Sequence, residues 1–310
     1  MSFANDNLPI LLAGIAQKIR VGYVFPDVAE TVARHVEAAA ASGRYDKQSA
    51  DTFCEQLTTD LRQWSDDAHL RVRYSATPYR PLTGDEVVRE QSDRRAHCER
   101  ISFGIASVGM LLDNIGYIDI REFVELSLSA DVITAAMSKI SHCAALILDL
   151  RACVGGDPEA VTWLASYLFD KPMQLSTLEP RNAASESFWT EAHVPGERFD
   201  VTKPVFVLTA NFTFSGAKQF AYDLQTLKRI TVVGERTGGG AHACNFHWIN
   251  EYFNLLLPEC RPVNPITGTN WEKTGVAPDL PCDADVALAV AKNRIAANRR
   301  GETTTSETLS

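Results

Sequence analysis

Apolar positions up to about residue 67 recur at intervals of three and four, which is the spacing of one face of an α-helix. Polar and glycine-containing stretches divide this region into three periodic segments. The pattern predicts helices over 8–21, 27–43 and 49–64. Asp27 and Glu30 have the spacing of a capping box, so we expect them at the start of the second helix.

After Asp67 the pattern changes to short runs that are typical of β-strands, at 70–75, 101–108 and 115–120. Polar stretches with glycine and proline separate these runs. The change of period predicts an N-terminal helical domain over 1–72, followed by a second domain.

From residue 127 onward, helix-like and strand-like segments alternate, which is typical of an α/β domain. The predicted helices span 127–140, 157–169, 214–226 and 283–297, and the predicted strands span 144–150, 205–209, 230–234 and two runs within 245–257. The apolar runs indicate buried, largely parallel strands, whose functional sites normally lie at their carboxyl ends. The loops 151–156 and 210–215 are therefore the first places to look for chemistry. We assign the core domain to 73–298 and a disordered tail to 299–310.

Composition narrows the class of protein. Of the 310 residues, 45% are hydrophobic, which is enough for a buried core. The formal net charge of −9 argues against a nucleic-acid partner, because that affinity depends on Lys and Arg side chains that neutralise phosphate. No apolar run approaches the roughly 20 residues that span a bilayer, and the start lacks the basic segment of a signal peptide. We therefore expect a cytoplasmic protein with no membrane partner. The seven cysteines contain no CxxC pair, so neither a disulfide framework nor a zinc site is expected.

Ser215 follows an apolar strand and a polar turn, and it opens a predicted helix. At that position its hydroxyl is presented over the end of a sheet, where the N–H groups of the helix N-terminus can stabilise a developing oxyanion. Serine is also a preferred N-cap residue, so an ordinary capping role stays open. Ser215 is therefore a candidate nucleophile with a structural alternative.

Gly155 and Gly156 lie in the turn between strand 144–150 and the next predicted helix. Their backbone can approach a neighbouring loop closely and could donate a second oxyanion N–H beside that of Gly216. The alternative is a tight turn that needs glycine for a positive φ angle.

A third glycine-rich loop, 238–240, follows strand 230–234 and precedes His242. This loop lacks the Lys-Ser/Thr pair with which a P-loop holds phosphate and magnesium, and no GxGxxG motif opens a helix after a strand. We therefore expect no nucleotide, and the sequence indicates no other cofactor.

Four motifs in register make the chain similar to a known family. They are Arg151-x-x-x-Gly155-Gly156, Thr213-Phe-Ser215-Gly216-Ala, Val233-Gly234-Glu235-x-Thr237-Gly-Gly-Gly240 and Gly275-Val-Ala-Pro278-Asp279. In order and approximate spacing they resemble the tail-specific, or C-terminal-processing, serine peptidases of family S41, over roughly 70–295. The helical N-terminus with Asp67-Ala-His69-Leu is similar to the branch that contains the modules of interphotoreceptor retinoid-binding protein and their bacterial relatives. No PDZ-sized insertion separates the two parts, which also fits that branch.

The resemblance implies a ClpP/crotonase-like ββα spiral core and hydrolysis of amide bonds by an activated serine. Ser215 falls on the nucleophile, Gly216 on the residue that follows it, and Gly155 and Gly156 on the oxyanion loop. In the Ser–Lys branch of the family, the base is a lysine at a position that aligns with Gly240.

Because that lysine is absent, the chain resembles the tricorn-like arrangement, in which a histidine deprotonates the serine and a glutamate supports the site. His69 and Glu272 match those two positions. Neutral imidazole is a suitable base near pH 7 when a carboxylate or carbonyl holds its tautomer. The chain departs from the pattern at Ala68, where tricorn-type sites have serine, and at Cys153, where the glycine loop usually has asparagine.

Two further residues are weighed as an alternative base or a substrate contact. Lys218 forms Ser-x-x-Lys with Ser215, and residues at i and i+3 share a helix face. Relatives usually carry an acidic residue there, so we interpret Lys218 as a solvated surface lysine. His242 follows the glycine-rich loop closely enough to be a substitute base, and the alternative is an exposed loop histidine. No carboxylate or cysteine pattern completes a ligand set with His242 and His247, so no metal site is predicted.

The first hypothesis is a serine-type peptidase that cleaves peptide or protein substrates through an acyl-enzyme on Ser215, with His69 as general base. The alternative, motivated by the missing lysine, is a catalytically weak module that binds a hydrophobic ligand such as a retinoid or fatty acid. Crotonase-like chemistry on acyl-CoA shares the implied fold but not the motif register. Resemblance to ring-forming relatives leaves oligomer formation open.

Overall fold

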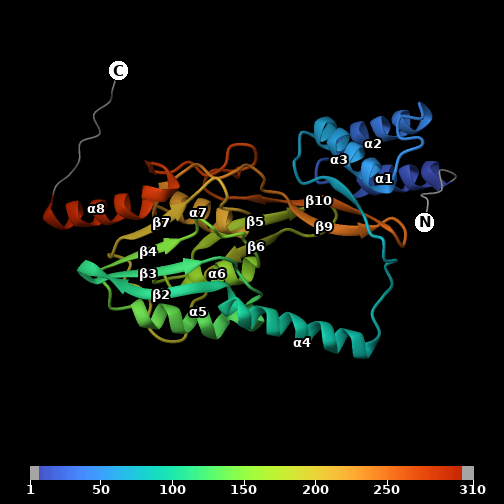
Figure 1. The fold of residues 1–310 in the computed structure, drawn as a ribbon. Helices are drawn as coiled ribbons and strands as arrows, with labels where there is room; N and C mark the ends of the chain where they lie inside the picture. The colour runs from blue at the N-terminus through green and yellow to red at the C-terminus, as the bar shows by residue number, and fades with distance from the viewer. Residues whose placement is uncertain (1–6, 302–310) are drawn as a thin grey trace, which may run out of the picture. The chain divides into compact units, whose positions relative to one another are not determined.

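The computed structural model describes residues 7–301 as a mixed α/β chain (Figure 1). The chain divides into two compact units, and each is assembled from segments that are distant in sequence. Within the described residues, the N-terminal unit comprises 7–88 together with 177–186 and 240–263. The core unit comprises 89–176, 187–239 and 264–301.

Three helices begin the N-terminal unit, namely α1 (Leu8–Gly22), α2 (Pro26–Ala41) and α3 (Ala50–Ser65). Each buries one apolar face, so the prediction of three amphipathic helices is confirmed. Ser49 is the N-cap of α3, where its hydroxyl accepts a hydrogen bond from the Thr52 N–H at 3.2 Å.

The start of α2 differs from the sequence prediction. Pro26 occupies the first turn and Phe25 the N-cap, which makes no side-chain capping bond within the described residues. Asp27 therefore lies inside the helix, and Glu30 pairs with Arg20 at 2.8 Å instead of reaching back to the helix start. The predicted capping box is wrong because a proline, whose φ angle already fits a helix, begins α2 one residue earlier.

An antiparallel sheet completes the N-terminal unit. Its long strand β10 (Phe253–Val263) pairs with β1 (Arg71–Tyr74) and with β9 (Ala243–Trp248), and β5 (Gln174–Pro180) and β6 (Glu186–Trp189) continue the order β1-β10-β5-β6. Phe253, Leu255 and Leu257 of β10 belong to the same buried cluster as the three helices. The predicted division between 72 and 73 therefore does not coincide with the division by compactness, because β1 is held by a strand from much later in the sequence.

A six-stranded sheet lies at the centre of the core unit. Its order is β11-β8-β7-β4-β3-β2, and neighbouring strands are parallel except for β2, which is antiparallel to β3. Every residue of β4 and β7 is buried. The prediction of buried, largely parallel strands is therefore confirmed. The strands are β2 (Ile105–Leu111), β3 (Ile115–Ile120), β4 (Ala145–Asp149), β7 (Val205–Thr209), β8 (Thr231–Gly234) and β11 (Leu280–Pro281).

Helices cover both faces of this sheet (Figure 1). On one face, Ala291 of α8 (Ala287–Arg300) packs in a buried cluster with Ile147 of β4. The other face meets α5 (Leu126–Ile140), where Ile133 and Ile118 of β3 line the same small cavity. Helices α6 (Pro158–Ser166) and α7 (Gly216–Thr226) begin directly after the turns that follow β4 and β7. These two turns carry the predicted chemistry.

Several elements were not predicted from the sequence. Helix α4 (Gly84–Arg100) has no apolar stripe, since Cys98 is its one buried residue in the described structure, and without a stripe there is no helical period to detect. Strands β5, β6 and β11 were also missed. Helix α8 continues to Arg300, so the segment 299–310 that was predicted to be disordered begins inside a helix. Its remainder, 302–310, lies outside the described residues.

Two exclusions hold for the described part of the chain. Residues 7–301 contain no PDZ domain between the helical region and the six-stranded sheet, as predicted. No helix within these residues combines the length and apolarity that crossing a membrane would require.

Helix α1 offers a direct test of the helical cluster. Leu12 is 2% exposed and Ile10 is 73% exposed on the same helix. We expect Leu12→Ala to lower the free energy of unfolding by about 2 to 5 kcal/mol, because it removes buried contacts and leaves a cavity. Ile10→Ala is the matched control and should change stability by less than about 0.5 kcal/mol. Equal midpoints for both variants in urea denaturation would contradict this packing.

Candidate active site

Ser215 stands on a strained turn between β7 and α7. Its backbone angles are φ 48° and ψ −126°, a region that non-glycine residues rarely occupy. Its side chain is exposed and makes no capping hydrogen bond within the described residues, although the residue occupies the N-cap position. The ordinary capping role considered from the sequence is therefore not what this serine performs. A strained strand-to-helix turn that presents a hydroxyl is typical of a nucleophile.

Hydrogen bonds from the neighbouring turn hold this conformation. The Thr213 hydroxyl donates to the Leu150 carbonyl oxygen at 2.8 Å and accepts from the Ala210 N–H at 3.0 Å. The Phe214 N–H donates to the Cys153 carbonyl oxygen at 3.0 Å. The turn after β7 is thus fastened to the turn after β4 at Thr213 and at Phe214.

The glycine loop lies directly against the nucleophile turn. Gly155 has φ +88°, and a Cβ atom on it would lie 2.5 Å from both the Phe214 carbonyl oxygen and the Ser215 Cβ atom. Gly156 has φ +136° and would likewise collide with the backbone of Phe123. No side chain fits at either position, so the glycines are required for close approach as well as for a positive φ. The Phe123 N–H fixes the loop by donating to the Gly155 carbonyl oxygen at 2.7 Å.

Backbone N–H groups converge near Ser215. Gly216 is the first residue of α7, so its N–H has no partner within the helix. A Cβ on Gly216 would lie 3.4 Å from the Gly156 nitrogen, which shows how near the two residues are. The Gly155 N–H instead hydrogen-bonds to Cys153, a thiol whose pKa burial raises to about 12 and which therefore stays protonated. The structure thus brings together Ser215, Gly216, Gly155 and Gly156 as the sequence predicted.

Lys218 is buried, so its interpretation as a solvated surface lysine is wrong. Its Nζ atom donates to the Gly239 carbonyl oxygen at 3.1 Å and lies 4.2 Å from the centre of the Phe214 ring. Burial lowers the pKa of Lys218 to about 8, while the negative charge of Glu272 acts in the opposite direction. The sequence could not reveal this burial, because the partner is a backbone carbonyl of a glycine and leaves no residue pattern.

Glu272 lies in a segment that packs on the glycine-rich loop of the core unit. A Cβ on Gly239 would lie 2.8 Å from the Cα atom of Lys273. The Thr237 N–H donates to the Val276 carbonyl oxygen at 3.1 Å, and the Val276 N–H donates back to the Thr237 hydroxyl at 2.9 Å. The loop and the segment that carries Glu272 are therefore one connected structure.

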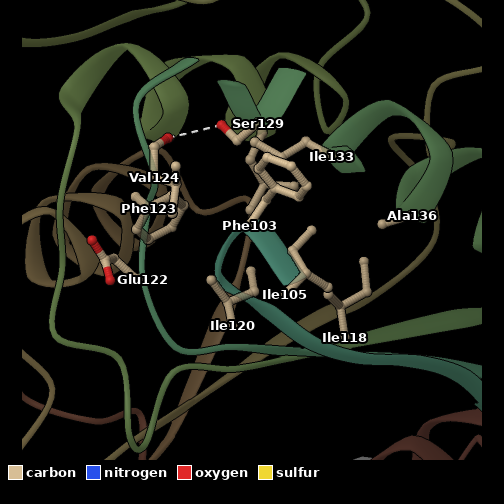
Figure 2. A pocket seen from close by; sticks show the side chains of 11 residues that line it. Phe103, Ile105, Ile118, Ile120, Glu122, Phe123, Val124, Ser129, Ile133 and Ala136 are labelled. Carbon is tan, nitrogen blue, oxygen red and sulfur yellow. Dashed lines mark hydrogen bonds between the residues drawn. The ribbon is translucent and has the colours of Figure 1, made fainter. Parts of the chain in front are cut away.

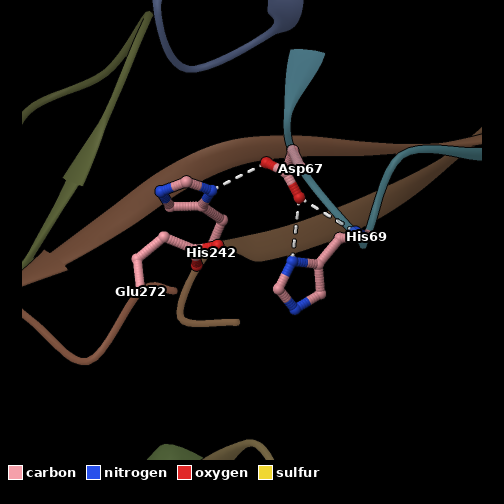
Figure 3. A group of neighbouring side chains, drawn as sticks. All are labelled: Asp67, His69, His242 and Glu272. Carbon is pink, nitrogen blue, oxygen red and sulfur yellow. Dashed lines mark hydrogen bonds and ion pairs between the residues drawn. The ribbon is translucent and has the colours of Figure 1, made fainter. Parts of the chain in front are cut away.

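The N-terminal unit contains a cluster of two histidines on one carboxylate (Figure 3). Asp67 Oδ1 lies 3.0 Å from His69 Nδ1, and Asp67 Oδ2 lies 2.7 Å from His242 Nδ1. The Tyr23 hydroxyl donates to Asp67 Oδ2 at 3.0 Å. A carboxylate that accepts from Nδ1 leaves Nε2 as the basic nitrogen of a neutral imidazole. Both rings are therefore oriented as bases.

His242 is buried, so the alternative of an exposed loop histidine is wrong. The sequence analysis also missed Asp67 as the partner of both rings, although Asp67 stands in the Asp-Ala-His motif that was singled out. Burial alone would raise the pKa of Asp67, but the hydrogen bonds from His242 and His69 outweigh it and hold this pKa well below its usual range. The carboxylate is thus charged at neutral pH. If the protein binds a metal ion, these three side chains are of ligand type.

Comparison with known families agrees with this geometry. The model of peptidase family S41 matches residues 114–282. The chain belongs to peptidase family S41. A second model, described as the N-terminal domain of Peptidase_S41 in eukaryotic IRBP, matches residues 4–101. Both findings confirm the resemblance seen in the sequence.

One curated S41 protein is similar over part of its length. The carboxy-terminal processing protease CtpA of Bacillus subtilis (strain 168) is 33% identical over 129 residues, which are 41% of this chain and 26% of that protein. The match thus spans about a quarter of this relative.

Solved structures share the fold over nearly the whole chain. A candidate peptidase from Parabacteroides merdae ATCC 43184 has a TM-score of 0.68 at 16% identity, covering 98% of this chain and 100% of that one. The photosystem II D1 C-terminal processing protease has a TM-score of 0.60 at 15% identity, covering 90% of this chain and 94% of that one. The helical N-terminal region and sheet core are therefore an S41 architecture.

The contact between the glycine loop and the nucleophile turn can be tested at Gly155. Gly155→Ala places a methyl group 2.5 Å from Ser215 Cβ on a residue with positive φ, so one of the two turns must shift. We expect destabilisation by more than about 1 kcal/mol and loss of Ser215 labelling by a fluorophosphonate. Gly109→Ala is the control, because a Cβ there meets nothing within 4 Å. Unchanged labelling and melting temperature in Gly155→Ala would refute the contact.

The charge on Asp67 predicts an acid-dependent stability. Because the folded pKa is lowered, the carboxylate stabilises the fold above the unfolded Asp pKa of about 3.9, and this contribution is lost as pH falls below it. We expect Asp67→Asn to be less stable than wild type at pH 7 and to lose less stability between about pH 5 and pH 2. Asp66→Asn is the control at the exposed neighbour. Parallel pH curves for wild type and Asp67→Asn, measured by urea denaturation, would be the contrary result.

Proposed function

We propose that the protein is a serine peptidase in which Ser215 is the nucleophile. The observation that carries this proposal is the strained, exposed turn of Ser215, held against a loop of two glycines. Strain of this kind persists only where the surroundings enforce it, and it is typical of functional sites. Family membership, with a processing protease among the relatives, supports the same reaction class.

We assign the general base to His69. As the serine Oγ bonds to the substrate carbonyl carbon, Oγ gives its proton to His69 Nε2, and the carbonyl π electrons move to oxygen. Collapse of this intermediate breaks the C–N bond, and the leaving amine takes the proton from His69. Water then attacks the acyl-enzyme by the same route and releases the second product with free Ser215.

The oxyanion of each intermediate is assigned to the N–H groups of Gly216 and Gly156. Gly155 belongs to the same loop, but its N–H already donates a hydrogen bond to Cys153. We therefore assign Gly155 the role of allowing the loop to approach Ser215 closely. Asp67 fixes the tautomer of His69 through the 3.0 Å contact to Nδ1. Glu272 is proposed to assist the base, as its position in the sequence motif suggests. His69 belongs to the N-terminal unit and Ser215 to the core unit.

The hydrophobic-ligand alternative gains no support from the apolar cavity in the core unit (Figure 2). This cavity, between α5 and the strands β2 and β3, has a volume of about 10 Å³. That is room for roughly one water molecule, whereas sites for drug-sized ligands measure about 300 to 1,000 Å³. The Ser129 hydroxyl at its edge already donates to the Val124 carbonyl oxygen at 2.8 Å. A retinoid or a fatty acid does not fit this space.

Three finer assignments belong to the same proposal. The substrates are peptides or proteins, as the name of the curated relative suggests for that protein. The core is of the ClpP/crotonase-like spiral type that the motifs imply. The cytoplasm is the proposed location, on the sequence features given above.

The test is covalent labelling by a fluorophosphonate at pH 7, with the modified peptide identified by mass. We expect label on Ser215 in wild type, none in Ser215→Ala, and a rate lower by about 10³-fold or more in His69→Ala. Ser107→Ala, at an exposed serine of β2, is the control and should label as wild type. Hydrolysis of a peptide library should follow the same order. A folded wild type that resists the label would refute the proposal.

A further inference from the structure

Lys218 is a buried cation to which the peptidase mechanism assigns no part. It lies one helical turn after Ser215 on α7 and is fully buried. Removing an amine from water is costly unless its charge or its protons find compensation, so a buried lysine needs a reason. Its contacts supply one.

Contacts of the Lys218 amine join the nucleophile turn to the glycine-rich loop. Phe214, whose ring centre lies 4.2 Å from Nζ, is the residue directly before Ser215. Gly239, whose carbonyl oxygen accepts from Nζ at 3.1 Å, belongs to the loop that packs on the segment of Glu272 and Lys273. A single side chain therefore bridges two of the four family motifs.

The protonated form of Lys218 suits these contacts better than the neutral amine. An ammonium is attracted to the face of an aromatic ring more strongly than a neutral amine is. A charged donor also strengthens the hydrogen bond to the Gly239 carbonyl. The negative charge of Glu272 favours the same form.

We propose that Lys218, as an ammonium, is a positioning residue that clamps the glycine-rich loop to the nucleophile turn and keeps Ser215 and its oxyanion donors in reactive geometry. This inference rests on the proposed function, because it concerns the reactivity of Ser215. The glycine-rich loop has no lysine at Gly240, and Lys218 of α7 provides a lysine contact to the neighbouring Gly239.

Whether the reactivity of Ser215 rises or falls with pH depends on which protonation state of Lys218 forms the clamp. Burial lowers the pKa of Lys218 to about 8, and the charged groups on the segment packed against its loop are Glu272 and Lys273. Because the ammonium is the clamping form, the reactivity of Ser215 falls as pH rises through about 8. A lysine that acted as the base would produce the opposite trend, since only the neutral amine accepts a proton.

The experiment measures the rate of fluorophosphonate labelling of Ser215 from pH 6 to pH 10 in wild type, Lys218→Met and Lys218→Arg. Methionine fills a similar volume without charge, so we expect the melting temperature to stay or rise, as when a buried charge becomes apolar. The labelling rate at pH 7 should fall by about tenfold or more, and the decline above pH 8 should vanish. Arginine keeps its charge to pH 12 and beyond, so Lys218→Arg should retain part of the rate without the decline. Lys228→Met, at an exposed lysine two residues after the end of α7, is the control and should behave as wild type.

The outcomes separate this inference from the proposed function. A wild type that does not label overturns the peptidase proposal itself. A wild type that labels while Lys218→Met labels at the same rate with the same pH profile overturns the clamp alone. A wild-type rate that rises through pH 8, and a Lys218→Met variant that loses this rise, would make Lys218 a base and also overturn the clamp. If Lys218→Met does not fold, the wild-type profile decides, because the clamp requires a decline between pH 7 and pH 9.

Discussion

The contact between the Gly155 backbone and the Ser215 turn is the constraint on which the rest of the core unit depends. The two turns leave the carboxyl ends of β4 and β7, which are adjacent and parallel, so the order of the sheet places them at one edge. Thr213 then fastens one turn to the other through the Leu150 carbonyl. The positive φ of Ser215 is maintained because Thr213 and Phe214 fasten the turn that precedes it, and glycine at 155 leaves the space that this requires.

Each unit also contains a buried charged side chain, Asp67 in the N-terminal unit and Lys218 in the core unit. Asp67 receives a hydrogen bond from Tyr23 and lies within hydrogen-bond distance of one nitrogen on each of two histidines, so its charge is compensated and serves to orient both rings. Lys218 donates to a backbone carbonyl and lies against an aromatic face, and burial lowers its pKa. The exposed ion pair of Arg80 and Glu86 contributes little by comparison, because water screens it. The buried charges of Asp67 and Lys218 therefore matter more to the candidate active site than the exposed ion pair does.

The sequence predicts the elements whose pattern is local and misses the contacts whose partners are remote. Strands β4 and β7 are continuous apolar runs, so their positions and the turns after them could be predicted. Helix α4 has no apolar face, so its sequence shows no helical spacing of apolar residues from which it could be predicted. The candidate nucleophile and its glycine loop were found because each lies within a short motif. The pairing of His242 with Asp67 joins residues 175 positions apart, and no spacing rule connects them.

Strand β10 explains how such distant residues meet. Leu255 of β10 pairs with Val72 of β1 on one side and with His247 of β9 on the other. His69 shortly precedes β1, and His242 directly precedes β9, so both histidines enter from strands whose register β10 sets. A shift of one residue in either pairing would turn the side chains of that strand to the opposite face and would move its histidine away from Asp67. The buried Leu255, which packs in the helical cluster, opposes that shift. The orientation of both imidazoles is thus a consequence of core packing in the N-terminal unit.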